Sequence, residues 1–125
     1  MGEWLPEHEA ARKEIEPWVL DWREENPELF TPEFVYDRCH VESDRFISNV
    51  KRYRRNVKIE RIYGFKFGEF MGTPVISQAH IAVRFKGIVL DWTARQFDPF
   101  SPVPRITTVA EFHEEWTPAR KRRTP

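Results

Sequence analysis

The hydrophobic pattern of the chain changes its period once, and this change sets the fold class. Up to about residue 55, apolar side chains recur every three to four residues, as on one face of a helix. After Asn56 they alternate with polar side chains, as on a half-buried strand. The chain has 125 residues, which is enough for one domain with a single hydrophobic core. We therefore predict an α+β domain in which helices from the first half pack on an antiparallel sheet from the second half.

The first half of the chain predicts several helical segments. Residues 7–25 carry an amphipathic stripe, and Pro17 is expected to divide it into two short helices or to kink it. Thr31 before Pro32 predicts the N-cap and first position of a short helical turn. Residues 38–55 predict a central helix with one apolar and one charged face. The apolar face is expected to carry Cys39, Phe46, Ile47, Val50 and Tyr53, and the charged face Glu42, Asp44, Arg45, Lys51 and Arg52.

The second half of the chain predicts an antiparallel sheet. Its strands are expected at residues 57–65, 75–85 and 88–92. A tight turn at Lys86–Gly87 joins the last two strands, and a turn-rich connection joins the first two. That connection is marked by Gly64, Gly68, Gly72 and Pro74. A proline-containing loop at 97–104 and a short helix at 109–116 are expected to follow.

The whole pattern predicts a single domain over residues 1–118. Residues 1–30 are interpreted as an N-terminal helical extension of this domain. Residues 119–125 are basic and poor in apolar side chains, so they are expected to form a flexible tail.

Cys39, His80 and Asp91 provide the parts of a thiol nucleophile with its base and orienting acid. Cys39 falls near the N-terminal end of the central helix, where the helix dipole and free amides favour a thiolate. His80 and Asp91 fall on adjacent strands, each about five residues from the predicted turn, so we expect them to be cross-strand partners. Each residue also fits a structural role, because a free cysteine commonly behaves as a small buried hydrophobe.

The order Cys39, His80, Asp91, with a helix opening at the cysteine and a His/Asp hairpin, resembles the papain-like fold. The similarity is greatest to its compact bacterial toxin and effector branch, which includes glutamine deamidases. In that branch a glutamine shortly after the aspartate helps to form the oxyanion hole, and the resemblance assigns this role to Gln96. It implies hydrolysis through a thioester intermediate and extends from about Arg38 to Phe97.

The residues around Cys39 differ from those of typical papain-type peptidases. The residues Tyr36-Asp37-Arg38 offer no oxyanion glutamine before the cysteine, and His40-Val41 follows it. We therefore favour a protein glutamine deamidase or related amide hydrolase. The Cys39 backbone amide and Gln96 would hold the oxyanion, and Trp92 is a candidate wall of the substrate cleft. The alternatives are a cysteine protease or acyl transferase with the same triad, or a non-catalytic protein-interaction module.

The composition of the chain limits which binding partners and which cellular compartment are expected. Twenty Lys and Arg residues balance 20 Asp and Glu residues, so no overall field attracts nucleic acid or anionic membrane. No apolar stretch approaches the roughly 20 residues that span a bilayer. The acidic N-terminus lacks a signal-peptide pattern, and the single cysteine fits a reducing compartment, so we expect a cytoplasmic protein. The expected partner is a protein or peptide amide, and the oligomeric state is left open.

No cofactor is expected from the sequence. Cys39, His40, His80 and His113 contain metal-binding atoms, but their spacing matches no compact zinc module. The basic runs at 51–55 and 120–123 are interpreted as solvated segments.

Overall fold

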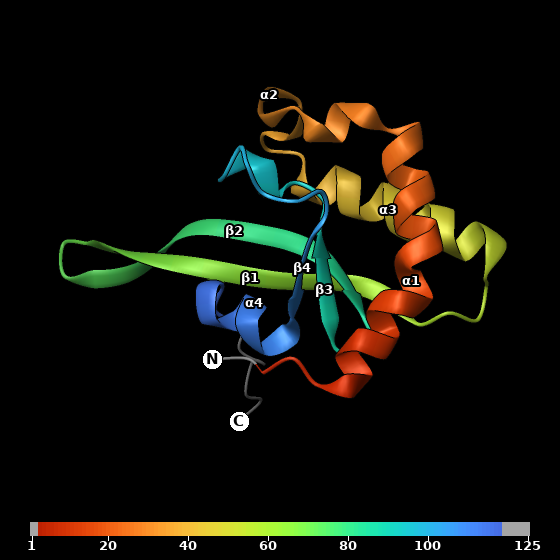
Figure 1. The fold of residues 1–125 in the computed structure, drawn as a ribbon. Coiled ribbons are helices and arrows are strands. Elements are labelled where there is room, and N and C mark those ends of the chain that lie inside the picture. Colours follow the sequence, from red (N-terminus) through yellow and green to blue (C-terminus); the bar gives the residue numbers. More distant parts are fainter. Residues whose placement is uncertain (1–2, 119–125) are drawn as a thin grey trace.

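The computed structural model describes residues 3–118, in which helices pack on both faces of one antiparallel sheet (Figure 1). The tail expected at 119–125 lies outside the described residues. The helical elements are α1 (Pro6–Glu25), η1 (Pro27–Phe30), α2 (Pro32–Val35), α3 (Cys39–Tyr53), η2 (Ala94–Gln96) and α4 (Val109–Glu115). The strands are β1 (Ile59–Phe70), β2 (Thr73–Phe85), β3 (Ile88–Asp91) and β4 (Arg105–Thr108).

The sheet has the order β1-β2-β3-β4, and every neighbouring pair is antiparallel. The predicted α+β class, with N-terminal helices and a helix beginning at Cys39 packed on this open sheet, is confirmed. Helices α1 and α3 pack on one face of the sheet, and α4 packs on the other (Figure 1). The larger core therefore lies between α1, α3 and the sheet, and a smaller one lies under α4.

Helix α1 runs unbroken through Pro17, so the expected division into two helices is wrong. Proline removes only the hydrogen bond from its own nitrogen to the carbonyl of Lys13, and the buried apolar face on either side holds the helix together. That face comprises Ala11, Ile15, Val19 and Trp22, all in the main core. The helical segment expected as an extension is thus part of the core.

The connection between β1 and β2 is a two-residue hairpin turn, shorter than the turn-rich connection expected from Gly64 to Pro74. Gly64 and Gly68 lie within β1, and only Met71 and Gly72 form the turn, both with positive φ angles of 50° and 78°. Lys86 and Gly87 adopt the same conformation with φ angles of 44° and 81°, which confirms the predicted second turn. Two consecutive left-handed residues are typical of two-residue hairpins.

Three other features of the structure differ from the predictions. Strand β4 was not expected, because its four residues after a proline-containing loop carry too short an alternation to identify. Glu42, expected on the charged face of α3, is fully buried, where Arg38 and Arg45 pair with its carboxylate at 2.8 Å each. Tyr53, expected on the apolar face, is exposed near the last turn.

Candidate active site

Cys39 is the first residue of α3, as predicted, and it is half-buried. The chain approaches the helix through Asp37, whose φ of 58° places it in the left-handed region. This sharp bend presents the free end of α3, with its unpaired amides, to the sheet. A thiolate at this position is stabilised by the helix dipole.

His80 and Asp91 form a buried hydrogen bond of 2.7 Å between Nε2 and Oδ2. The expectation that they are directly opposed on the two strands is wrong. The register pairs Val83 with Leu90, so its continuation places Ala82 opposite Asp91. The turn at Lys86–Gly87 begins six residues after His80 but ends only four before Asp91, and the long imidazole bridges the diagonal.

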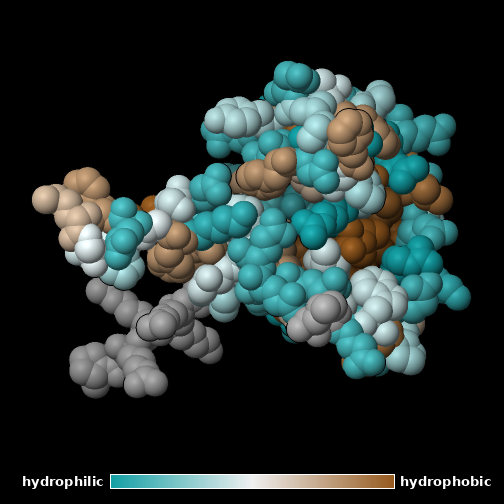
Figure 2. Space-filling model, turned by 60° about the vertical axis from the view of Figure 1, so that its left-hand side comes forward, coloured by the Kyte–Doolittle hydropathy of each residue, from teal (hydrophilic) through white to brown (hydrophobic). Residues whose placement is uncertain are grey.

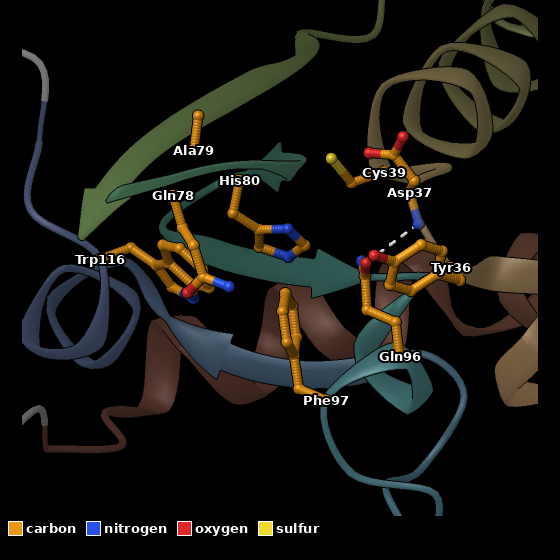
Figure 3. A pocket seen from close by; sticks show the side chains of 9 residues that line it. All are labelled: Tyr36, Asp37, Cys39, Gln78, Ala79, His80, Gln96, Phe97 and Trp116. Atoms are coloured by element: carbon orange, nitrogen blue, oxygen red, sulfur yellow. Dashed lines mark hydrogen bonds between the residues drawn. The ribbon is translucent and has the colours of Figure 1, made fainter. Parts of the chain in front are cut away.

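The second nitrogen of His80 is directed toward Cys39 (Figure 3). This Nδ1 atom is buried and has no hydrogen-bond partner within the described chain. The ring is only 1% exposed and lies among aromatic side chains. Its centroid is 4.8 Å from that of Trp116 and 5.2 Å from that of Phe97. Aromatic packing therefore orients the imidazole. Asp91 is hydrogen-bonded to Nε2, so Nδ1 is available to the thiol.

The electrostatics of the pair favour a thiolate beside an imidazolium. Burial acts to lower the pKa of His80, but the hydrogen bond with Asp91 and the interaction with Cys39 outweigh it and raise the pKa to about 9. Burial acts to raise the pKa of the Cys39 thiol, but His80 and the backbone of Ile81 outweigh it and lower the pKa from its ordinary value. The two shifts belong to a coupled pair, and both favour charge separation.

Gln96 lies at the same site and is held at both ends of its amide. Its Oε1 accepts a hydrogen bond of 3.2 Å from the Asp37 backbone, and its Nε2 donates one of 2.9 Å to Thr93 Oγ1. Thr93 in turn donates to Asp91 Oδ1 from its backbone nitrogen at 3.1 Å and from its hydroxyl at 3.4 Å. Thr93 therefore links the Asp91 carboxylate to the Gln96 side chain.

These groups open into a cleft of about 380 Å³ (Figure 3). The residues that line it are Tyr36, Asp37, Cys39, Gln78, Ala79, His80, Gln96, Phe97 and Trp116. The cleft joins the start of α3, the β2 strand and the segment after β3. Its volume is within the range typical of ligand sites.

Trp92 does not line this cleft, although it was the expected wall. Its side chain is buried in the main core, with its ring 4.9 Å from that of Phe46. The chain turns at the end of β3, and this turn directs Trp92 toward α3 and the core. Trp116 and Phe97 form the aromatic wall instead.

Several residues of the site were not identified from the sequence. Trp116 follows Phe112 by four residues, which predicts an apolar helix face but not a position beside His80. Thr93 and Asp37 act through hydrogen bonds whose partners depend on the tertiary arrangement. The spacing from Asp91 to Gln96 was the only sequence signal for this part of the site.

The two other histidines considered as metal ligands, His40 and His113, make contacts elsewhere. His40 Nε2 lies 3.1 Å from Asp44 on the same helix, and His113 Nδ1 lies 2.9 Å from the Trp116 carbonyl. Within residues 3–118, no cluster of three or more His, Cys, Asp or Glu side chains could hold a metal ion. No helix in the same range is long and apolar enough to cross a membrane.

Comparison of the chain with protein-family models, with curated proteins and with solved structures finds no match. Function must therefore be inferred from the geometry of the site.

Proposed function

We propose that this chain is a cysteine-dependent amide hydrolase of papain-like type, acting on the side-chain amide of a protein glutamine. The observation that carries the proposal is the buried His80–Asp91 hydrogen bond, which leaves Nδ1 of His80 facing Cys39 in the wall of a cleft. A nucleophile, a base and an orienting acid in this arrangement activate a thiol without a cofactor.

In the first half of the reaction, the Cys39 thiolate attacks the carboxamide carbon and forms an S–C bond. The carbonyl electron pair moves to the oxygen, giving a tetrahedral oxyanion. When this collapses, the C–N bond breaks and the His80 imidazolium gives its proton to the departing nitrogen, so ammonia leaves. The product at this stage is a thioester on Cys39 and a neutral His80.

In the second half, His80 takes a proton from a water molecule that attacks the thioester carbon. The S–C bond then breaks and the carboxylic acid leaves, losing its own proton to solvent to become glutamate. The proton that His80 took from water stays on the imidazole and restores the ion pair with the Cys39 thiolate. Asp91 stabilises the imidazolium in both halves without itself accepting the proton.

Two donors are available for the oxyanion. The backbone N–H of Cys39 is at the first helical position, where it has no partner within the helix. Gln96 Nε2 donates one of its hydrogens to Thr93, which leaves the second for the substrate oxygen. Removing one such donor costs on the order of 10²–10³ in rate.

The substrate assignment depends on the resemblance to glutamine deamidases. The Asp91–Gln96 spacing is one part of that resemblance. It can be tested by mass spectrometry of candidate proteins treated with the native chain or with Cys39→Ala. A gain in mass matching deamidation at a glutamine, seen only with the native chain, supports the proposal. Fragments would instead indicate a protease, and an unchanged substrate set would favour the interaction module.

The activation of the thiol can be tested without a substrate. Iodoacetamide labelling of Cys39 across pH is expected to show a midpoint below the ~8.5 of an ordinary thiol. In His80→Ala the midpoint should return toward that ordinary value, because the imidazolium is lost. A midpoint near ~8.5 in the native chain would contradict the thiolate–imidazolium pair.

A further inference from the structure

One edge of strand β2 is open where it passes the cleft. Strand β1 pairs with β2 along its whole length, but β3 pairs only with the segment Val83–Phe85. Among residues 3–118, therefore, no strand pairs with residues 73–81 of β2 on that side. In Figure 1, β1 and β2 extend as an arm beyond the shorter β3 and β4.

The hairpin geometry determines which backbone groups point to this edge. Phe85 and Ile88 flank the two-residue turn and so form a hydrogen-bonded pair. Backbone direction alternates along a strand, so Val83, Ile81 and Ala79 direct their N–H and C=O groups to the same side. The Ile81 carbonyl accepts a hydrogen bond of 3.4 Å from Ser43 on α3, as this assignment requires. For Ala79 no hydrogen bond on this side to another described residue is found.

The outer edge of the same hairpin is closed at the corresponding position. Phe65 pairs with Ala79 across the hairpin and directs its backbone groups outward. Both of these groups bond to Thr117, with N–O distances of 2.9 and 2.8 Å. At this position, therefore, the described part of the chain covers the edge away from the cleft and leaves open the edge that borders the cleft.

The open edge leads into the cleft that contains Cys39. Gln78, Ala79 and His80 line the cleft from β2, and Tyr36 and Phe97 line it from other elements. A chain segment paired with Ala79 would lie between these residues and pass beside the thiol (Figure 3).

Further along the arm, apolar side chains continue the face that carries Ala79. Phe67 and Ile76 are cross-strand partners on this face and are 54% and 58% exposed. Figure 2 shows apolar side chains at the projecting end of the molecule. Exposed apolar residues in continuity with a polar cleft are typical of a surface that binds another polypeptide.

We propose that the substrate binds as an extended segment that adds a strand to the open edge of β2. Its backbone would hydrogen-bond to Ala79 and Ile76, and alternate side chains would contact the apolar face of the arm. This inference rests on the proposed function and defines its substrate class as an unfolded or strand-forming protein segment, in preference to a helix or a free amino acid. Strand addition supplies affinity through the main chain and specificity through every second side chain.

An open strand edge could also pair with the same edge of a second copy of this chain. Two features of the arm disfavour such pairing. Phe70 and Thr73 flank the turn at Met71–Gly72 and so form a hydrogen-bonded pair. The next residue, Pro74, therefore faces the open edge, where it provides no N–H. An irregularity between Lys66 and Phe67 also interrupts the register of the arm. Proline and bulges are devices that prevent edge-to-edge association.

The test uses Cys39→Ala, labelled with ¹⁵N, and a capped glutamine peptide of about nine residues with flanking valines and threonines. Two further peptides are N-methylated on their backbone amides, one at the odd-numbered residues and the other at the even-numbered residues. If a strand is added, one N-methylated peptide should bind at least about tenfold more weakly and the other like the parent, because only alternate amides face β2. The parent peptide should shift the amide resonances of Ala79 and Ile76.

On the protein side, Ala79→Pro removes the N–H at the open edge and leaves the β1 ladder intact, as Pro74 does farther along. Ala79→Val is the matched variant, because it keeps the N–H and favours a strand. Binding should weaken about tenfold in Ala79→Pro relative to Ala79→Val. Equal affinities, with both variants folded by NMR, would contradict the edge assignment.

The proposed function and this inference can fail separately. If the native chain deamidates both N-methylated peptides as fast as it deamidates the parent peptide, the proposed hydrolase activity stands and strand addition is wrong. If binding alternates but the native chain releases no ammonia, strand addition stands and the hydrolase is wrong. A dimer formed through β2, or no saturable shift up to roughly 1 mM peptide, would also overturn the inference.

Discussion

His80 makes a different contact at this site through each part of its imidazole ring. Its Nε2 atom bonds to Asp91, its faces contact aromatic rings, and its Nδ1 atom is left facing Cys39. Because the ring is buried, each contact restricts both its orientation and its protonation state. Thr93 adds a second connection, since it bonds to both Asp91 and Gln96.

Asp91→Asn tests the role of the carboxylate. The amide is neutral, so the pKa that His80 shows in the native chain, about 9, should fall toward the ordinary 6.5. Hydrolysis should fall by about 10⁴, as when the orienting acid of a triad is replaced. NMR titration of the imidazole measures the first effect, and Asp21→Asn on the exposed face of α1 is the control. An unchanged His80 titration would remove Asp91 from the proposed triad.

Thr93→Val tests the link between Asp91 of the proposed triad and Gln96, the proposed oxyanion donor. Valine has nearly the same volume but cannot accept the hydrogen bond from Gln96 Nε2. We expect kcat to fall by roughly 10–100-fold with little change in KM, because a misplaced Gln96 weakens transition-state binding. Thr93→Ser, which retains the hydroxyl, should restore most of the rate. Equal losses in both variants would indicate a packing role only.

Among the elements, α4 and β1 together position the aromatic wall of the cleft. Gly64 on β1 lies opposite His80, and a Cβ atom at this position would come within 2.2 Å of the Trp116 Cβ atom. The missing side chain is therefore what lets Trp116 approach the sheet and reach the imidazole ring.

Gly64→Ala should displace Trp116 and destabilise the fold by about 1–3 kcal/mol, because the added methyl overpacks this contact. Urea unfolding measures the free energy, and tryptophan fluorescence reports the displacement. Gly68→Ala on the same strand is the matched control, since its Cβ would be 3.4 Å from the nearest atom, the Ser77 Cβ. Similar effects in both variants would show that strand propensity, and not the contact with Trp116, requires the glycine.

At the scale of the whole molecule, α1 belongs to the same core as α3 and the sheet. Ile15 of α1, Phe46 of α3 and Trp92 after β3 are all buried in this core. Helix α3, which presents Cys39, thus packs against the sheet and, through Phe46 and Trp22, against α1. The arm formed by β1 and β2 extends beyond the shorter β3 and β4 (Figure 1), and Gln78, Ala79 and His80 of β2 line the cleft.

Ile15→Ala should lower the free energy of unfolding by about 2–5 kcal/mol, as for other large-to-small changes in a core. Leu20→Ala on the same helix is the control, because Leu20 is 46% exposed and surface changes usually stay within about 0.5 kcal/mol. Urea titration followed by circular dichroism measures both. Comparable small losses would mean that α1 is an extension outside the core.

The sequence by itself determined the α+β class, the helix that begins at Cys39 and the hairpin turn at Lys86–Gly87. These features depend on local periodicity and on turn chemistry, which act between residues close in the chain. The residue types and their placement on these elements brought Cys39, His80 and Asp91 into one hypothesis, and the resemblance to papain-like deamidases added Gln96.

Only the tertiary structure decided how these residues meet. The diagonal contact of His80 with Asp91, the burial of Trp92 and the use of Trp116 as the wall depend on register and on packing between distant segments. Helix α1 passes Pro17 unbroken because burial of its apolar face outweighs one lost backbone bond. The open edge of β2 follows from the shortness of β3, a property of the assembled sheet that no local pattern records.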